Sequence, residues 1–245
     1  MSALIVVLVA QAEMFDPGKV RAFADHLYGQ EDYGAALNEY RRYTFLADSA
    51  EAQAHDRIID CLTHLERYGE AITEAEKIND ANRRHYIKGM IYFLAGAMDS
   101  SRAYLEGVDV PYRNRTDARR MIGLGYAYEY RFSDAAGYIA MPQYAPSRKK
   151  PVLGALFSVF PGGGHAYAGR WGDGIYSLFV IGTGTLLSYY YHEREETVKF
   201  GFTLGTTLLL YAGNIYGGIN AVRNYNRSAN EDYLEQIMQM NRPRE

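Results

Sequence analysis

Residues 161–174 read PGGGHAYAGRWGDG, and their six glycines make this stretch the first candidate for a phosphate-binding loop. A P-loop places a lysine and then a serine or threonine after its last glycine, so that an ammonium meets the phosphates and a hydroxyl meets magnesium. Here Gly169 is followed by Arg170 and Trp171. A dinucleotide-binding loop needs a glycine where this sequence has Tyr167. The stretch therefore fits neither phosphate-binding motif.

Other side chains that perform chemistry do not form a catalytic pattern. The sequence contains neither an HExxH zinc motif nor a GxSxG nucleophile motif. Cys61, the single cysteine, lies in the helical pattern RIIDCLTHL, which predicts a small buried apolar residue rather than a reactive thiol. Asp56 and Asp60 share a helix face, where like charges repel, and we expect a solvated surface there. We therefore expect no catalytic residue, no metal, no cofactor and no enzymatic activity.

The helical elements in the first half of the chain are repeated. Four segments begin with an aromatic residue or methionine and place a small residue three positions later. The intervals between successive segments are 35, 30 and 34 residues, and another helical pattern precedes each segment. Helix pairs of this kind stack into a solenoid, because no pair buries its apolar face alone. The key positions are Tyr33 with Ala36, Tyr68 with Ala71, Met98 with Ser101, and Phe132 with Ala135.

Two further signals support helices in this half. Asp16 followed by Pro17 is a typical helix start, in which the aspartate caps the first turn. Gly89 and Gly123 lie within helical patterns and predict close approaches between helices. No stretch of the sequence alternates convincingly with the period of a β-strand. We therefore predict an all-α fold.

The small and aromatic positions of residues 16–141 resemble those of a tetratricopeptide repeat array of about four helix pairs. The resemblance implies a concave surface, lined by the first helix of each pair, that binds a protein or peptide partner. Tyrosine and arginine, which dominate interface hot spots, are prominent there. The alternative is that the same residues form only the solvated face of a spacer. The predicted groove consists of Arg21, Asp25, Tyr28, Asp60, His64, Tyr86, Phe93, Arg120 and Tyr128.

The second half of the chain has the pattern of a membrane domain. A polar linker, residues 142–150, separates the repeats from three apolar segments at 152–160, 174–191 and 200–222. The last two lack charged residues and reach the roughly 20 residues that cross a bilayer. Tyrosines cluster near their ends, as is typical of membrane interfaces. We expect a transmembrane helical hairpin at 151–224 with two or three spans, and the alternative is a soluble buried hairpin.

The glycine-rich stretch, together with Lys149 and Lys150 before it, resembles the motif of the two-transmembrane-helix hairpin domain family. The resemblance implies a compact membrane module rather than an enzyme. It assigns the motif to Pro161, Gly162, Gly164, His165, Tyr167, Gly169, Arg170 and Gly174. Glycines four residues apart and amide side chains favour close packing of membrane helices, and we expect such packing at Gly213, Asn214, Gly217 and Asn220.

The N-terminal residues and the charges around the apolar segments indicate on which side of a membrane the repeats lie. Residues 1–12 combine an apolar run with small residues in the pattern of a secretory signal, which would place the repeats in the periplasm. Basic residues flank the apolar segments on both sides, and with two spans the positive-inside rule would place both flanks in the cytoplasm. We expect an inner-membrane protein with periplasmic repeats, and the cytoplasmic orientation stays open. Residues 225–245 predict an amphipathic helical tail.

These patterns favour a membrane-anchored scaffold that holds a protein or peptide partner at a bilayer surface. Its expected contacts are that partner and membrane lipid, and self-association into a homo-oligomer stays open. The net charge of −3 gives no reason to expect nucleic acid as a partner. The alternative function is an accessory component of a small membrane transport or protein-insertion system, in which the glycine-rich hairpin is the active part.

Overall fold

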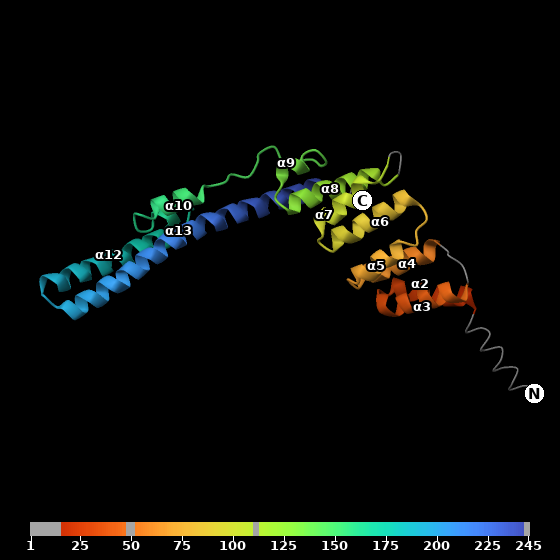
Figure 1. Cartoon of the computed structure of the whole chain (residues 1–245), viewed down its shortest axis with the longest axis horizontal. Helices are drawn as coiled ribbons and strands as arrows, with labels where there is room; N and C mark the ends of the chain where they lie inside the picture. The colour runs from red at the N-terminus through yellow and green to blue at the C-terminus, as the bar shows by residue number, and fades with distance from the viewer. Residues whose placement is uncertain (1–15, 48–51, 110–112, 243–245) are drawn as a thin grey trace, which may run out of the picture. The chain divides into compact units, whose positions relative to one another are not determined.

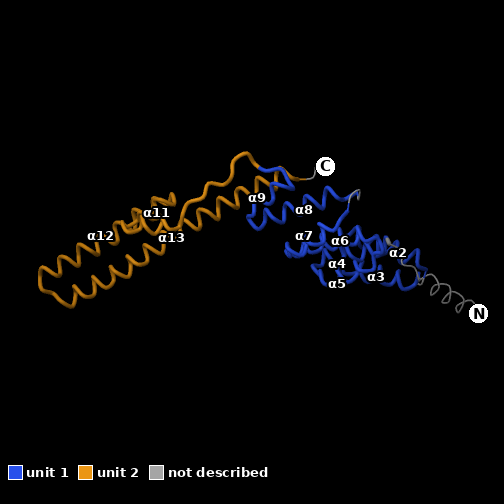
Figure 2. Tube along the Cα trace, turned by 45° about the horizontal axis from the view of Figure 1, so that its top comes forward, with its two compact units in different colours: residues 1–141 blue, residues 142–245 orange. Residues whose placement is uncertain are grey.

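The computed structural model describes residues 16–47, 52–109 and 113–242, so the expected signal at 1–12 lies outside the described residues. The regular secondary structure of these ranges is helical and includes no strand, which confirms the all-α prediction (Figure 1). The chain divides after Met141 into two compact units (Figure 2). Each unit is described by itself below.

Unit 1 is a series of helix pairs in which each helix packs against the next along the chain. Such nearest-neighbour packing is the arrangement of a helical solenoid. The second helix of every pair begins at the aromatic residue or methionine of the repeated pattern, and the small residue three positions later is buried. The pairs are α2 (Pro17–Gly29) with α3 (Tyr33–Leu46), α4 (Ala52–His64) with α5 (Tyr68–Ala75), α6 (Ala81–Leu94) with α7 (Met98–Glu106), and α8 (Arg115–Tyr128) with α9 (Phe132–Ala135).

Local capping explains where three of these helices begin. The carboxylate of Asp16 accepts a hydrogen bond from the backbone amide of Gly18 at 2.9 Å, and Pro17 opens α2, as the sequence predicts. Asp32 and Asp80 cap α3 and α6 in the same way, with side-chain bonds to Ala35 and Arg83 of the first helical turn. Side-chain caps therefore fix the starts of α2, α3 and α6, whereas α5, α7, α8 and α9 begin without a side-chain cap bond.

A left-handed residue forms the tight turn inside each helix pair. It lies two positions before the second helix, and its φ is 62°, 57°, 75° and 57° at Glu31, Glu66, Gly96 and Tyr130 respectively. The next amide donates back across the turn, as in the 3.0 Å bond from the amide of Asp32 to the carbonyl of Leu27. This is the hydrogen bond that closes many helix ends. The turn geometry is thus repeated along with the sequence pattern.

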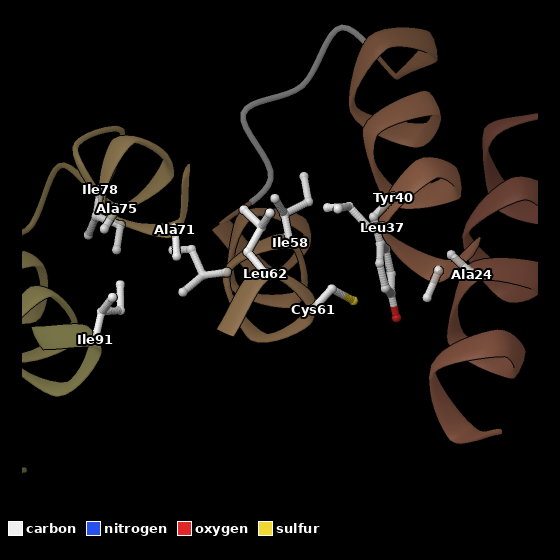
Figure 3. Close-up of a cluster of buried hydrophobic side chains, with 12 residues drawn as sticks. Ala24, Leu37, Tyr40, Ile58, Cys61, Leu62, Ala71, Ala75, Ile78 and Ile91 are labelled. Atoms are coloured by element: carbon white, nitrogen blue, oxygen red, sulfur yellow. The ribbon is translucent and has the colours of Figure 1, made fainter. Parts of the chain in front are cut away.

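The core of unit 1 contains small and branched side chains at the helix contacts. Figure 3 shows Leu37 and Tyr40 of α3 facing Cys61 of α4, and all three are almost fully buried. Burial raises the pKa of the Cys61 thiol to about 11, so this cysteine is an unreactive core residue, as predicted. A Cβ at Gly89 would lie 2.5 Å from the Leu105 side chain, and Gly123 is equally crowded. Both glycines therefore mark close helix contacts, as expected.

Unit 2 is built around a long helical hairpin. Helix α12 packs along α13, and two short helices, α10 and α11, pack on α13 as well (Figure 1). Helix α13 is continuous through the segment that the sequence analysis treats as a separate tail, so residues 225–240 are its last turns. The bounds are α10 (Pro151–Phe157), α11 (Gly163–Tyr167), α12 (Trp171–Glu193) and α13 (Thr197–Met240).

The expected transmembrane spans are not supported. Within the described ranges, none of the helices is both long and apolar enough to cross a membrane. Glycine, serine, threonine and tyrosine interrupt the leucines and isoleucines in α12 and in the first half of α13, which lowers the hydropathy of both helices. The three predicted apolar segments are nevertheless helical, at α10, α12 and α13.

The left-handed turns provide a test of the repeat geometry. We expect Gly96→Ala to destabilise unit 1 by about 1–2 kcal/mol, because a Cβ is strained at a φ of +75°. The matched control is Gly29→Ala at the last residue of α2, where open space surrounds the added Cβ and alanine favours the helix by up to about 1 kcal/mol. Thermal unfolding followed by circular dichroism measures both variants. Equal stability of the two variants would contradict the left-handed turn.

Candidate functional sites: a charged groove and an apolar hairpin

A polar cavity of about 500 Å³ opens on unit 1 between α2, α3 and α4. Its wall mixes two arginines with three aspartates, a tyrosine and a glutamine. Arg21, Asp25 and Asp60 of the predicted groove belong to it. The full lining is Arg21, Asp25, Tyr40, Gln53, Ala54, Asp56, Arg57 and Asp60.

Protein contacts hold one side of this cavity in place. The hydroxyl of Tyr40 donates to Asp25 at 2.6 Å, and Arg21 donates to the amide oxygen of Gln53 at 2.7 Å. Arg21 also lies 3.9 Å from the Asp25 carboxylate. Burial, together with the Asp25 carboxylate, raises the pKa of Tyr40 far above its usual range, so this hydroxyl stays protonated and keeps donating. This side of the cavity is therefore preorganised.

A second cavity of about 240 Å³ continues the first along unit 1. The two share Asp56 and Asp60 of α4, so these carboxylates form the ridge between them. Tyr86 of the predicted groove lines the second cavity. We call the two cavities together the charged groove. The second cavity is lined by Asp56, Ile59, Asp60, Arg83, Tyr86, Ile87, Met90, Arg113 and Asn114.

The two shared carboxylates are held in an unfavourable environment for negative charge. Burial raises the pKa of Asp60, Asp56 adds to the rise, and Arg57 opposes it. Burial likewise raises the pKa of Asp56, against the pull of its ion-pair partner Arg83. Within the described structure, Oδ1 of Asp56 is buried without a hydrogen-bond partner. A cationic or hydrogen-bond-donating group of a bound partner would relieve both carboxylates.

Two predicted groove residues lie instead in an aromatic cluster. The His64 ring stacks on Tyr33 with centroids 4.1 Å apart, and Tyr28 meets both rings edge-on. The Arg57 guanidinium lies 4.4 Å from the centroid of the Tyr28 ring, a cation–π contact. Burial is the main cause that raises the pKa of Tyr28. Tyr28 thus contacts Arg57, and neither Tyr28 nor His64 lines either cavity.

The remaining predicted groove residues lie farther along the solenoid. Phe93 of α6 and Tyr128 of α8 form an aromatic pair with centroids 6.0 Å apart. Arg120 pairs with Asp117 on its own helix at 3.3 Å. These three line neither cavity of the charged groove. The structure therefore brings together Arg21, Asp25, Asp60 and Tyr86, and leaves the other five predicted residues outside.

Most of the side chains that line the charged groove were not predicted from the sequence. Tyr40 comes from the second helix of its pair, whereas the family register selects first helices only. Asp56 shares a face of α4 with Asp60. Their four-residue spacing was the one signal in the sequence for this part of the groove, but it predicted a solvated surface instead. Arg57 and Arg83 also line the groove without being predicted.

In unit 2, the amide side chain of Asn214 joins α13 to the glycine-rich stretch. Its oxygen accepts from the amide of Gly162 at 2.9 Å, and its nitrogen donates to the carbonyl of Ser158 at 2.8 Å. Asn214 is buried, and Gly162 has a φ of +83° with a backbone oxygen of Gly174 only 2.0 Å from where a Cβ would lie. The glycines of this stretch therefore serve a backbone turn and close packing instead of phosphate binding.

Small residues continue this packing along one face of α13. A Cβ at Gly164 would lie 2.9 Å from the Cα of Gly218, and a Cβ at Gly217 would lie 2.9 Å from the ring of His165. Gly213, in contrast, faces open space, and no hydrogen bond joins the half-buried Asn220 side chain to the described structure. Two of the four predicted packing residues, Asn214 and Gly217, thus make the contacts.

The other motif residues shape the end of the hairpin. The carbonyl of Tyr167 accepts from the Lys149 ammonium at 2.9 Å, and the Tyr167 hydroxyl accepts from the backbone amide of Lys150 at 3.3 Å. Gly169 adopts a φ of +89° in the turn before α12, and Arg170 pairs with Asp173 at 2.5 Å. Pro161 borders two open apolar cavities of about 270 and 370 Å³.

Large apolar side chains cover the outside of unit 2. We call α12 together with residues 197–222 of α13 the apolar hairpin. Leu209 and Phe202 of α13 are 77% and 76% exposed, and Val152 of α10 is 77% exposed. Further exposed apolar residues on α12 and α13 include Ile175, Tyr176, Phe179, Leu186, Leu187, Tyr190, Leu208 and Tyr216. This many exposed apolar side chains on two adjacent helices make the apolar hairpin a candidate interaction surface.

No cluster of histidine, cysteine, aspartate and glutamate able to hold a metal ion occurs in the described ranges. No model of a known protein family matches the sequence, and no curated protein is detectably similar to it. The charged groove and the apolar hairpin are therefore interpreted from their own geometry.

The raised pKa of Asp60 predicts a pH-dependent stability effect. A carboxyl whose pKa rises on folding contributes stability below its unfolded pKa and loses it as pH rises through the folded value. Asp60→Asn should therefore raise the unfolding free energy at neutral pH, by less than about 1 kcal/mol because water still reaches the carboxylate. The gain should disappear below the ordinary aspartate pKa of about 3.9. Urea unfolding at both pH values measures it.

The control for this variant is Glu106→Gln, which removes one carboxylate from the exposed end of α7. It should leave the unfolding free energy within about 0.5 kcal/mol at both pH values. A loss of stability in Asp60→Asn at neutral pH would show that the carboxylate is stabilised by the protein, contrary to the burial that raises its pKa.

The Asn214 bonds predict a large difference between two asparagines of α13. Asn214→Ala should destabilise unit 2 by about 2–4 kcal/mol, because it leaves a buried amide and a buried carbonyl without partners. Asn220→Ala removes a half-buried amide with no such bonds and should change stability by about 0.5 kcal/mol or less. Thermal unfolding of the full chain in mild detergent compares the two. Similar losses in both variants would contradict this role of Asn214.

Proposed function

We propose that the protein is a membrane-anchored scaffold of the tetratricopeptide-repeat type. Unit 1 holds a segment of a protein or peptide partner in the charged groove, and unit 2 anchors the chain at a lipid bilayer through the apolar hairpin. The observation on which this rests is the exposed apolar surface of unit 2, which water solvates poorly.

The distribution of the apolar side chains favours lipid over a protein partner at this surface. Neighbours such as Ile175 and Tyr176 differ by about 100° around a helix axis, so the exposed apolar residues of α12 cover a wide arc. A docked protein helix buries a narrower stripe, whereas lipid surrounds a helix on all free sides. The proposal requires that these side chains enter the apolar layer, and does not require a complete span.

The charged groove suits a peptide segment better than a small apolar ligand. Its two cavities follow each other along α2 to α6 and present charges of both signs beside the ring of Tyr86. A chain that lies along them can bring its own backbone donors and side chains to Asp56 and Asp60. The preorganised bond from Tyr40 to Asp25 reduces the ordering cost of binding.

The internal bonds of Asn214 argue for packing over transport. Both polar atoms of its side chain are bonded to the backbone at Gly162 and Ser158, which leaves little capacity for a passing substrate. The exposed apolar surface and the charged groove are what a tethered binding protein requires. We therefore prefer the scaffold to a transport or protein-insertion component.

A vesicle flotation experiment tests the anchor. The full chain should float with phosphatidylcholine vesicles, and a double variant Phe179→Asp with Leu209→Asp should stay with the soluble fraction. Each aspartate replaces an exposed apolar residue, so the fold should persist by circular dichroism while partitioning falls by at least about 100-fold.

The matched control is Phe45→Asp in unit 1, where the phenylalanine is 85% exposed but lies outside the apolar hairpin. It should float like the parent chain. Flotation of the double variant would contradict the anchor. So would a stable oligomer of the parent chain that does not float and becomes monomeric in the double variant, because the apolar hairpin would then be a self-association surface.

A further inference from the structure

One end of the apolar hairpin is surrounded by exposed cations. Arg148 and Lys150 precede α10, and Arg223 and Arg227 lie one turn apart on α13. We call these four residues the basic collar. All four are exposed, and none of them makes an ion pair within the described structure.

Hydrogen bonds hold the two halves of the basic collar side by side. The backbone amide of Lys149 donates to the side-chain oxygen of Asn226 at 2.8 Å, and the Asn226 amide donates back to the Lys149 carbonyl at 2.8 Å. One turn farther, Arg148 donates to Asn230 at 3.2 Å. The collar is therefore a fixed arrangement of charges from segments far apart in the sequence.

The nearby carboxylates do not neutralise this arrangement. Asp173 pairs with Arg170 at 2.5 Å. The next acidic residues along α13, Glu231 and Asp232, are exposed and lie beyond Arg227, with no ion pair to the collar. Positive charge thus remains open to an external anion.

Aromatic and apolar side chains begin directly at the basic collar. The Lys149 ammonium lies 4.0 Å from the centroid of the Tyr225 ring. Val152 and Leu156 of α10 are 77% and 61% exposed, and Trp171 opens α12 with 68% exposure. A free phosphate would use the cations alone, whereas a phospholipid presents an anionic headgroup and acyl chains together. The mixed surface therefore favours lipid as the source of the anion.

The opposite end of the apolar hairpin has a different charge. Its turn contains Glu193, Glu195 and Glu196, and the ammonium of Lys199 is paired with Glu196. Arg194 lies over the Tyr190 ring at 4.3 Å. Only the collar end of the apolar hairpin thus complements an anionic surface.

We infer that the basic collar binds the headgroups of anionic phospholipids and thereby fixes which end of the apolar hairpin faces an anionic membrane surface. The inference rests on the proposed membrane anchor and adds the lipid class and the orientation. Each basic side chain near an anionic surface contributes about a fivefold gain in partitioning, so the four collar residues give roughly several hundredfold and any three of them on the order of 100-fold.

Flotation of the full chain on two kinds of vesicle tests the collar. One is phosphatidylcholine alone, and the other contains phosphatidylglycerol and phosphatidylcholine at about three to seven. The parent chain should bind the anionic vesicles roughly several hundredfold more strongly, and high salt should remove this gain. The triple variant Lys150→Gln, Arg223→Gln and Arg227→Gln should lose on the order of 100-fold of the gain and still bind phosphatidylcholine.

The control removes the same net charge from unit 1, through Lys19→Gln, Lys77→Gln and Arg115→Gln, and it should keep the gain. Equal binding of the parent chain to both vesicles, or an undiminished gain in the triple variant, would overturn the collar and leave the anchor intact. Failure of the parent chain to bind either vesicle would overturn the anchor and the collar together.

Discussion

Backbone-to-backbone contact between the glycine-rich stretch and α13 determines the character of unit 2. Gly154, Gly164 and Gly218 meet so closely that a Cβ at any of them would lie 2.9 Å or less from a carbonyl oxygen or hydroxyl across the contact. Since small residues and the Asn214 amide occupy this contact, many large apolar side chains of α10, α12 and α13 are left outside, while Ile181 and Val222 are buried. Unit 2 therefore exposes more large apolar side chains than a water-soluble domain usually does, which is what the proposed membrane anchor requires.

Unit 1, in contrast, buries its apolar side chains in a core, and its partly buried carboxylates lie in the charged groove. Tyr40, Leu37 and Cys61 form a dry core, while Asp56 and Asp60 remain partly buried carboxylates with raised pKa values. Carboxylates in such positions lower stability in the free protein. Binding of a partner that supplies donors or positive charge would recover that stability, which is a general feature of sites preorganised for a ligand.

The repeated positions made unit 1 predictable from the sequence. Tyr33, Tyr68, Met98 and Phe132 mark helix starts because the same left-handed turn precedes each of them. Cys61 and Gly89 were predictable because burial and close packing are short-range properties of a helix face. The groove was less predictable: Tyr40 enters it from a second helix, and Asp56 lines it only because α4 packs against α3. In unit 2, the length of the two uncharged segments predicted membrane spans. Glycine, threonine and tyrosine within these segments reduce their hydropathy, so their length alone was not a sufficient signal for a span.

The central claim is that the apolar hairpin enters lipid, and Trp171 offers the most direct measurement. It is the single tryptophan of the chain and is 68% exposed at the start of α12, so its fluorescence reports on this surface alone. Vesicles with brominated acyl chains should shift its emission to shorter wavelength and quench it, since bromine quenches at close range and tryptophan favours the interface. Emission that neither shifts nor falls when these vesicles are added would contradict the membrane anchor.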